Sequence, residues 1–338
     1  MLEWDNSTKK EKKPIVFDFY SPEQFYVLNK LLVIWTKNHY NEANRLFFIN
    51  SWNGWDEGSY LEPDKKYGYS SINAFSRALF NIPYRNEYNI SNLKFSSKIA
   101  VQAHIFYVDL LDEIITNINN IPVKYDLYVT TISLKTAKTL KNNIKSKSNA
   151  NKIEIKIVEN KGRDILPFLK QLKNIIKKYK YICHIHSKKG FHEPILSPVW
   201  RHYLYDNLLG NEEIIYNILS EFEEFENLGL IFPENFFYII SDNNLKKEPL
   251  NKIQINYLLK LIFPDNNFLA GTLLDFPAGN MFWAKVSAIY QVFEINFDDK
   301  IPVEDGQVDC TILHGIERIW LYVAKINGYY YRKIMNKY

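Results

Sequence analysis

Residues 153–190 read IEIKIVENKGRDILPFLKQLKNIIKKYKYICHIHSKKG, and the fold class follows from this stretch. Hydrophobic alternation over 153–158 predicts a buried strand, and a polar turn follows at 160–164. Apolar residues at three- and four-residue spacing over 165–178 predict an amphipathic helix, and 181–185 predicts a second strand. The stretch is therefore a strand–turn–helix–strand unit, which indicates an α/β fold.

Two polar loops follow the two strands of this unit. In open α/β sheets, ligands bind outside the carboxyl ends of the strands, because loops converge there and helix N-termini present unpaired N–H groups. The loops supply Gly162, Arg163, Asp164, His184, His186, Ser187, Lys188 and Lys189. Their charge predicts a site for a polyanion, with a nucleotide diphosphate as the simplest candidate. The alternative is an N-cap at Asp164 followed by a solvated basic turn.

The alternation of strands and helices continues on both sides of this unit. Upstream, the predicted elements are a strand at 98–107, a helix at 109–118, a strand at 126–131 and a helix at 134–145. Downstream, they are helices within 191–226, with Trp200 near a helix start, a strand at 229–233, a helix at 253–262, a strand within 276–285 and a helix at 309–325. Because crossovers between parallel strands are right-handed, this order predicts a largely parallel sheet.

Further candidate residues lie outside the first unit. The strand at 98–107 ends in a short polar loop that contains His104 and Tyr107. Glu317 lies on or beside the apolar face of the last predicted helix, next to Arg318. A carboxylate in such a place is either part of a structural ion pair or a base with a tuned pKa.

Several uncommon strings in this chain occur together and in a fixed order. They are NKGRDILPF with HIHSKKG in the first unit, FPAGNMFWAK at 276–285, DGQVDCTILHGIERIW at 305–320 and the closing Asn327-Gly328-Tyr329. Over about residues 95–335 the chain resembles the rhamnan synthesis protein F family of bacterial cell-wall and O-antigen polysaccharide clusters. The resemblance implies a GT-A-like, Rossmann-like α/β domain with flanking helices.

The resemblance also implies an activity. It implies a glycosyltransferase that moves a sugar, expected to be L-rhamnose from a dTDP donor, onto a growing surface polysaccharide by an inverting displacement. Glu317 is then the expected base, with Asp305 and Asp309 as alternatives. The residues expected to bind the nucleotide sugar are His104, Tyr107, Gly162, Arg163, Asp164, His184, His186, Lys188, Lys189, Gly279, Asn280 and Arg318.

The chain departs from the GT-A pattern at the place where a metal normally binds. Such enzymes usually carry Asp-x-Asp there, with a divalent cation bridging the carboxylates to the diphosphate. Here the sequence over 184–189 is HIHSKK, so lysines are expected to neutralise the leaving diphosphate directly and no cofactor is expected. His184 and His186 share one face of a strand and offer Zn²⁺ as an alternative, without a third ligand nearby.

The front of the chain carries a second resemblance. WDN at 4–6, SPEQF at 21–25 and FFINSWNGWDEGSYLEPDKKYG at 47–68 resemble the end of WbsX-type proteins, whose barrels are similar to family-99 endo-mannosidases. Those barrels carry WNEWxEG with two catalytic glutamates, and this chain has Gly54 at the first and Glu57 at the second. Since one carboxylate is missing and a barrel needs about 250 residues, hydrolysis is disfavoured.

The front segment is therefore expected to be a remnant. Its predicted elements are a helix from Ser21, a strand at 45–51 and a helix at about 70–81. A polar, turn-prone connection over 82–96 predicts a boundary between a small α/β fragment at 1–90 and the transferase domain at 91–338. A non-catalytic glycan-binding or assembly subunit is the alternative function, since Asp-x-Asp is missing.

Composition narrows the partners. The 338 residues carry 42 Lys and Arg against 38 Asp and Glu, and this balance of +4 does not indicate a nucleic-acid partner. The two cysteines, Cys183 and Cys310, lie in apolar segments and are expected to be free buried thiols. Without a signal peptide or a spanning segment, a cytoplasmic protein is expected, with lysine clusters that face solvent or an anionic membrane surface. The expected partners are the donor, a lipid-linked or polysaccharide acceptor and other polysaccharide-assembly enzymes.

Overall fold

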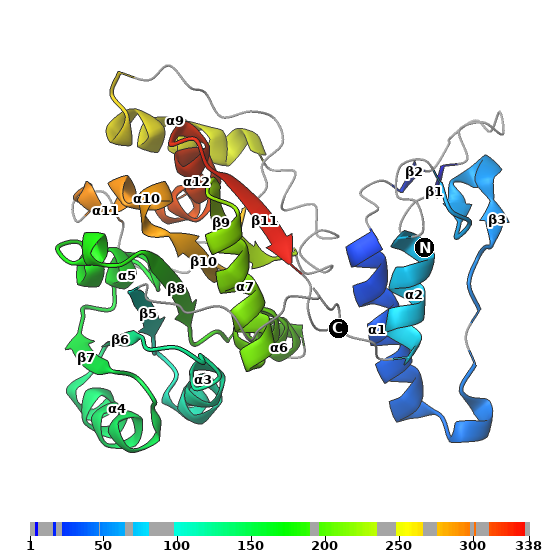
Figure 1. Cartoon of the computed structure of the whole chain (residues 1–338), viewed down its shortest axis with the longest axis horizontal. Helices are drawn as coiled ribbons and strands as arrows, with labels where there is room; N and C mark the ends of the chain where they lie inside the picture. The colour runs from blue at the N-terminus through cyan, green and yellow to red at the C-terminus, as the bar shows by residue number, and fades with distance from the viewer. Residues whose placement is uncertain are drawn as a thin grey trace. The chain divides into compact units, whose positions relative to one another are not determined.

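The computed structural model describes residues 4–5, 16–17, 22–46, 48–64, 70–80, 98–189, 196–234, 248–265, 276–297, 301 and 311–334. The chain divides into two compact units (Figure 1). The N-terminal unit comprises 1–85 with 236–241 and 335–338, and the sheet unit comprises 86–235 with 242–334.

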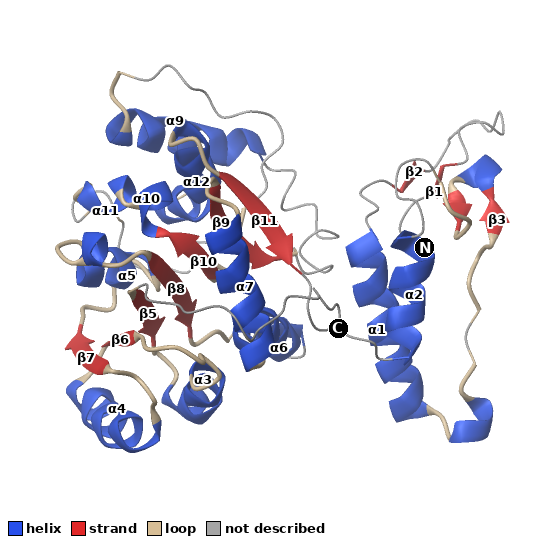
Figure 2. Ribbon diagram, in the orientation of Figure 1, coloured by secondary structure: helices blue, strands red, loops and turns tan. Residues whose placement is uncertain are grey.

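A seven-stranded sheet forms the centre of the sheet unit (Figure 2). Its strands are β5 (Ile99–His104), β6 (Asp126–Thr131), β7 (Lys152–Ile157), β8 (Tyr181–His186), β9 (Leu228–Pro233), β10 (Phe282–Lys285) and β11 (Tyr330–Ile334). They lie in the order β11-β9-β10-β8-β5-β6-β7, and every neighbouring pair is parallel except the two that β10 makes. The predicted α/β fold with a mostly parallel sheet is confirmed.

Helices cover both faces of this sheet. On one face lie α5 (Ile165–Leu172), α9 (Glu248–Ile262), α10 (Val286–Ile289), α11 (Gln291–Glu294) and α12 (Ile312–Ile326). The other face carries α3 (Leu111–Ile118), α4 (Leu134–Lys147), α6 (Leu196–Leu209) and α7 (Glu212–Glu224). Short 3-10 turns, η5 (Val108–Leu110) and η6 (Ile176–Lys178), adjoin α3 and precede β8. No helix in the described part of the chain has the length and apolar character needed to span a bilayer.

An aromatic cluster fills the space between the sheet and the first helix layer. Phe168 of α5, Phe282 of β10 and Trp320 of α12 are fully buried, and their ring centroids lie 5.3–6.3 Å apart. Burying each large apolar side chain stabilises the fold by roughly 1.5–3 kcal/mol. The cluster therefore gives the elements that approach the strand ends a rigid base.

Several predicted elements differ from the structure. The helix at 165–178 ends at Leu172, and the remaining residues form a turn and η6. The strand that contains Ile153 is only partly buried, because β7 is the edge strand with β6 as its one described neighbour. Trp200 lies inside α6 rather than near its start, and β11 was not predicted.

The N-terminal unit is built from helices α1 (Pro22–His39) and α2 (Ser70–Phe80), which pack against each other. Two small sheets accompany them, β1 (Trp4–Asp5) with β2 (Val16–Phe17) and β3 (Asn53–Gly54) with β4 (Ser59–Tyr60), and two turns, η2 (Glu42–Asn44) and η3 (Trp55–Glu57). The strand predicted at 45–51 is wrong. The described residues of that run have no strand assignment, although the Ser51 N–H donates to the Ser59 carbonyl of β4, and Phe48 is 95% exposed.

The parallel strands bring their carboxyl ends to one edge of the sheet. His104 at the end of β5 is in register with His186 at the end of β8. Because β10 is antiparallel to β8 and pairs Phe282 with His184, the loop that precedes β10 reaches the same edge. This edge therefore collects the loops that carry most of the predicted site residues.

Gly162 offers a test of the loop between β7 and α5. Its φ is +76°, and a Cβ there would lie 2.3 Å from the Cβ of Leu166. Gly162→Ala should lower the free energy of unfolding by about 2–5 kcal/mol, because left-handed strain and overpacking add. Gly328→Ala is the control, since its φ is +82° and a Cβ meets nothing within 4 Å, so only strain of about 1–2 kcal/mol applies. Urea denaturation measures both, and equal losses would contradict the packing argument.

Candidate functional site

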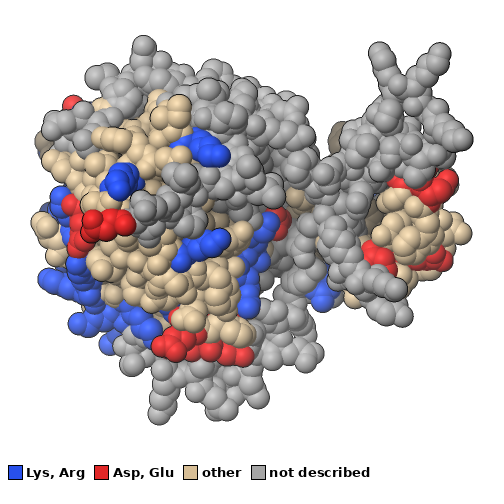
Figure 3. All heavy atoms as spheres, turned by 90° about the horizontal axis from the view of Figure 1, so that it is seen from above, with Lys and Arg blue, Asp and Glu red and all other residues tan. Residues whose placement is uncertain are grey.

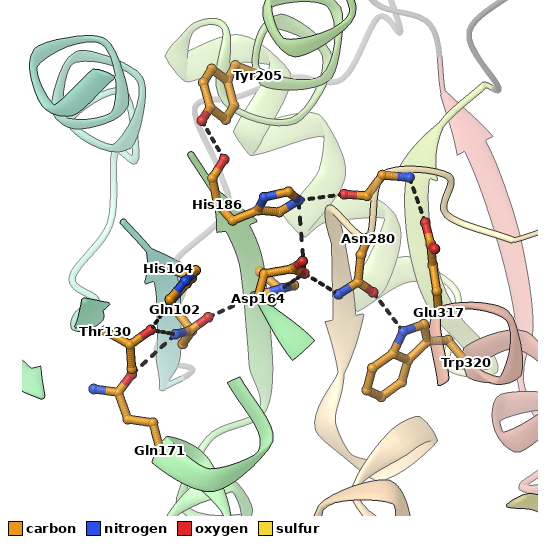
Figure 4. A network of polar contacts seen from close by, with 12 residues as sticks. Gln102, His104, Thr130, Asp164, Gln171, His186, Tyr205, Asn280, Glu317 and Trp320 are labelled. Carbon is orange, nitrogen blue, oxygen red and sulfur yellow. Dashed lines mark hydrogen bonds and ion pairs between the residues drawn. The ribbon is translucent and has the colours of Figure 1, made fainter. Parts of the chain in front are cut away.

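Two loops at the carboxyl edge share an unusual backbone conformation. Gly162 and Arg163 have φ values of 76° and 54°, and Gly279 and Asn280 have 86° and 53°. Left-handed residues outside glycine are strained and concentrate at functional sites. The first loop leads into Asp164, and the second aims the Asn280 amide at the Asp164 carboxylate (Figure 4).

Asp164 stands at the start of α5 but makes no capping hydrogen bond. Its Oδ2 instead lies 2.7 Å from Asn280 Nδ2, 3.2 Å from His184 Nε2 and 3.9 Å from His186 Nε2. The alternative interpretation, in which the Asp164 side chain caps the helix, therefore does not hold. Burial alone would raise the pKa of Asp164, but the His186 and His184 rings and the Asn280 amide hold it well below the usual range.

His184 is fully buried in β8 and has both ring nitrogens engaged. Nδ1 lies 2.8 Å from Gln102 Oε1 and Nε2 faces Asp164, while the ring stacks on Phe168 at 4.0 Å. Burial lowers the pKa of the His184 imidazole, and the Asp164 carboxylate opposes that effect. Among the described residues no group of three or more His, Cys, Asp or Glu side chains is arranged to hold a metal. With its nitrogens so used, His184 does not fit the zinc alternative.

Both backbone polar groups of Gly279 are hydrogen-bonded to side chains. His186 Nε2 donates to the Gly279 carbonyl at 2.8 Å, and the Gly279 N–H donates to Glu317 Oε1 at 3.0 Å. A Cβ at Gly279 would lie 3.0 Å from Leu204 and 3.1 Å from Trp200, so the glycine also serves packing. The backbone N–H and carbonyl of Gly279 thereby join β8, the loop before β10 and α12 at one residue.

Lys188 follows β8 and lies at the same edge. Its ammonium sits over the Trp200 ring, 3.9 Å from the centroid, and its carbonyl accepts from the buried Arg201 at 3.0 Å. Burial lowers the pKa of Lys188, while the charges of Glu317 and Asp164 raise it. Lys188 is therefore a positioned cation beside the two carboxylates.

Lys189 and the end of β5 form a more exposed flank. Lys189 pairs with Asp109, and its ammonium lies 5.0 Å from the centre of the Tyr107 ring. Ser187 Oγ accepts from the backbone N–H groups of residues 106 and 107 at 2.8 and 3.0 Å, which joins the ends of β5 and β8. His104 Nδ1 lies 2.9 Å from Thr130 Oγ1, and burial lowers the pKa of His104 to about 4.

Arg163 and Arg318 both contact His314 of α12. Arg163 Nη1 lies 3.2 Å from His314 Nε2, and Arg318 Nη1 donates to the His314 carbonyl at 3.0 Å. The Arg318 guanidinium also lies over the Phe276 ring, 4.7 Å from its centre. The alternative bases Asp305 and Asp309, like Cys310, lie outside the described residues, whereas Cys183 is a free buried thiol and its pKa is raised by burial.

Sequence reasoning missed the buried polar groups that support the site. Gln102 donates to Thr130 Oγ1 at 3.1 Å and to Gln171 Oε1 at 3.2 Å, and Trp320 Nε1 donates to Asn280 Oδ1 at 2.9 Å. Gln102 is a glutamine inside the buried strand IAVQAH, two residues before His104 and so on the same face. A buried amide in an apolar strand needs partners, and this was the available signal.

Charge on the surface of the sheet unit is mixed. On the face drawn in Figure 3, the Lys and Arg side chains lie among acidic and uncharged ones. A single-signed field of the kind that attracts nucleic acid is not visible on that face.

Asn280 offers a test of the contact with Asp164. Asn280→Asp replaces the donating Nδ2 with an acceptor beside Asp164 Oδ2, so the pKa of the introduced carboxyl is raised in the folded state. Stability should be retained at low pH and fall as pH rises through that raised pKa, by about 1–3 kcal/mol. Urea denaturation between pH 4 and 8 measures this (roughly the range in which a raised carboxyl titrates). Asn280→Gly, which tolerates positive φ, should lower stability without the new pH dependence.

Comparison with known proteins places the chain among polysaccharide-synthesis families. Residues 73–329 match the model for "Rhamnan synthesis protein F", and residues 1–75 match "Glycosyltransferase WbsX". The uncharacterized protein WxcX from two strains of Xanthomonas campestris pv. campestris is 28% identical over 320 residues, which is 93% of this chain and 43% of the relative. The chain thus spans less than half the length of these curated relatives.

Among solved structures, S. aureus TarS 1-349 aligns with a TM-score of 0.29 and 12% identity, covering 41% of this chain and 36% of that one. The family match covers far more of the sequence and includes Asp164, His186, Gly279 and Glu317. Both predicted resemblances are confirmed. The chain belongs to the rhamnan synthesis protein F family, preceded by a WbsX-type segment.

Proposed function

We propose that the sheet unit transfers a sugar from a nucleotide-diphosphate donor to a growing surface polysaccharide. One observation supports this most. The Lys188 ammonium interacts electrostatically with the Glu317 carboxylate, which is itself held by the Gly279 N–H. A transferase needs positive charge where the diphosphate leaves and a base where the acceptor hydroxyl attacks. These two groups offer both at one strand edge.

The finer assignment follows from the same residues. Lys188 and Lys189 neutralise the leaving diphosphate in place of an Asp-x-Asp metal site, and Gly162, Arg163 and Asp164 hold the nucleotide side. Glu317 removes the proton from the acceptor hydroxyl in an inverting displacement. The transferred sugar is L-rhamnose carried on dTDP; the family description, rhamnan synthesis, supports the rhamnose.

For the rest of the chain we propose a WbsX-type remnant at residues 1–90 and a transferase domain at residues 91–338. The family matches support two such parts and meet nearer the N-terminus, at residues 73–75. A Cβ at Gly54 would lie 2.5 Å from the carbonyl oxygen of Ser59, which argues against a restored catalytic side chain there. The acceptor is a lipid-linked or polysaccharide chain, and other polysaccharide-assembly enzymes act with this protein, at the cytoplasmic side of a membrane.

A second function, a non-catalytic glycan-binding or assembly subunit, is favoured by one observation. Glu317 Oε1 already accepts a hydrogen bond from the Gly279 N–H, so the carboxylate has a structural use independent of catalysis. Hydrolysis of donor without acceptor separates the two functions. A binding subunit turns over none.

Lys188→Ala tests the diphosphate assignment. In a thermal-shift panel with dTDP, UDP, GDP and CMP, with and without Mg²⁺, dTDP should raise the melting temperature of the unaltered chain without requiring Mg²⁺. Loss of one charge-assisted contact should weaken dTDP binding about 10- to 100-fold. Lys145→Ala, an exposed lysine in the last turn of α4, is the matched control and should bind normally. Equal binding by both variants would refute the role of Lys188.

Glu317→Gln tests the base. The amide oxygen can still accept from the Gly279 N–H, so the loop and donor affinity should be retained while the transfer rate falls about 10²- to 10⁴-fold. Rate is measured as nucleotide release with acceptor, and affinity by calorimetry. An unchanged rate would shift the role of base to another carboxylate.

A further inference from the structure

A chain of hydrogen bonds crosses the site and passes through the His184–Asp164 pair. Seven groups form it: the Val129 carbonyl, Gln171, Gln102, His184, Asp164, Asn280 and the Trp320 indole. Figure 4 labels five of their side chains, Gln171, Gln102, Asp164, Asn280 and Trp320. The Val129 carbonyl can only accept, and the Trp320 N–H can only donate. The two ends therefore fix the direction of every bond except the one between His184 Nε2 and Asp164 Oδ2.

The direction on the sheet side follows from the Val129 carbonyl. Gln171 must turn Nε2 toward that oxygen, at 3.2 Å, so its Oε1 faces Gln102. Gln102 must then present Nε2 to Gln171, at 3.2 Å, and Nε2 also donates to Thr130. Its Oε1 is left for His184 Nδ1 at 2.8 Å. His184 Nδ1 consequently carries a hydrogen.

The direction on the helix side follows from Trp320. Its indole N–H donates to Asn280 Oδ1 at 2.9 Å, so Asn280 Nδ2 points at Asp164 Oδ2, at 2.7 Å, and donates to it. The same Oδ2 lies 3.2 Å from His184 Nε2. Neither neighbouring amide can supply the hydrogen between these two atoms.

With Nδ1 protonated, a neutral His184 would turn the lone pair of Nε2 toward an ionised carboxylate, which is repulsive. The Asp164 carboxylate raises the pKa of His184 while burial lowers it, and at this contact we expect the carboxylate to prevail. We propose that the His184–Asp164 pair retains one proton at neutral pH, shared between Nε2 and Oδ2, so that the pair carries no net charge. It is either an imidazolium beside a carboxylate or an imidazole beside a carboxylic acid. Both forms satisfy every hydrogen bond in the chain.

Charged and titratable groups surround the pair. His104 on β5, His186 on β8 and Lys188 after β8 interact with it electrostatically. At the same edge, Glu317 on α12 and Arg163 in the loop before α5 interact with Lys188, and His314 on α12 contacts Arg163. Resting on the proposed function, the shared proton has a role. It prevents an uncompensated Asp164 charge from repelling a diphosphate beside Lys188. His184 and Gln102 are thus positioning residues.

Nuclear magnetic resonance of the ligand-free full chain labelled with ¹⁵N-histidine tests the proton directly, with His184 assigned from His184→Gln. The expected result at neutral pH is a hydrogen on Nδ1, with either a second hydrogen on Nε2 or a protonated Asp164 carboxyl seen by ¹³C. A bare Nδ1, or a neutral ring beside an ionised Asp164, would overturn the proposal.

Gln102→Met tests the cause. Without the Gln102 oxygen the ring is free to carry its single hydrogen on Nε2 and donate to an ionised Asp164, so the second proton should be lost. Gln291→Met is the matched control. It removes a side-chain amide of α11 that is bonded to Asn327 at the end of α12, outside the chain of bonds, and should leave the His184 signals unchanged. Retention of the pair's proton in Gln102→Met would refute the argument from bond direction.

Nucleotide affinity links the pair to the site. In the unaltered chain, dTDP affinity should fall over the pH range in which the pair loses its proton, and a constant affinity there would refute the role in charge. Because the resonance measurement needs no ligand, failure to bind any nucleotide would refute the proposed function alone. The protonation state of the pair would still be decided.

Discussion

The contact of the Asp164 carboxylate with His184 and Asn280 is the constraint on which the candidate site depends. Asp164 belongs to the loop after β7, His184 to a central strand, and Asn280 to the loop before β10. A buried carboxylate requires such partners, because an unpaired charge in the interior is costly. One oxygen therefore ties three separate segments of the chain into a single edge.

The surrounding contacts make this edge a preformed structure. The left-handed residues Arg163 and Asn280 hold their strained conformations because Gly162 and Gly279 precede them and the carboxylate network fixes their loops. The Gly279 carbonyl accepts a hydrogen bond from His186, and the Gly279 N–H donates one to Glu317. A ligand that binds here has little backbone to order, and this favours affinity.

Much of the sheet unit could be predicted from the sequence, because its strands and helices carry strong periodic patterns. The unit around 153–190 was predicted with the correct order, although the helix ends at Leu172 and the apolar face continues through a turn and η6. The predicted strand at 45–51 failed because a hydrophobic run needs a neighbouring strand, which pattern alone does not supply. Conversely, β11 is aromatic and basic without clean alternation, and only pairing with β9 makes it a strand.

The site could be predicted only in part. Charge and position at the strand ends indicated Asp164, His184 and Lys188 as site residues. The structure gathers them at one edge, and their roles stay predictions. The supporting amides of Gln102, Gln171 and the indole of Trp320 come from segments far apart in sequence, so their meeting depends on tertiary packing. Hydrogen-bond direction is a property of the assembled network, and no local pattern encodes it.

The antiparallel strand β10 has a consequence for how the protein is made. It lies between β8 and β9, although both precede it in the chain, so the two parts of the sheet join only after residues 282–285 have been synthesised. Until then β8, whose residues are all buried in the folded protein, presents an open apolar edge to other chains. Assembly of the sheet is therefore a late, long-range event, and the nascent chain depends on protection from aggregation during that interval.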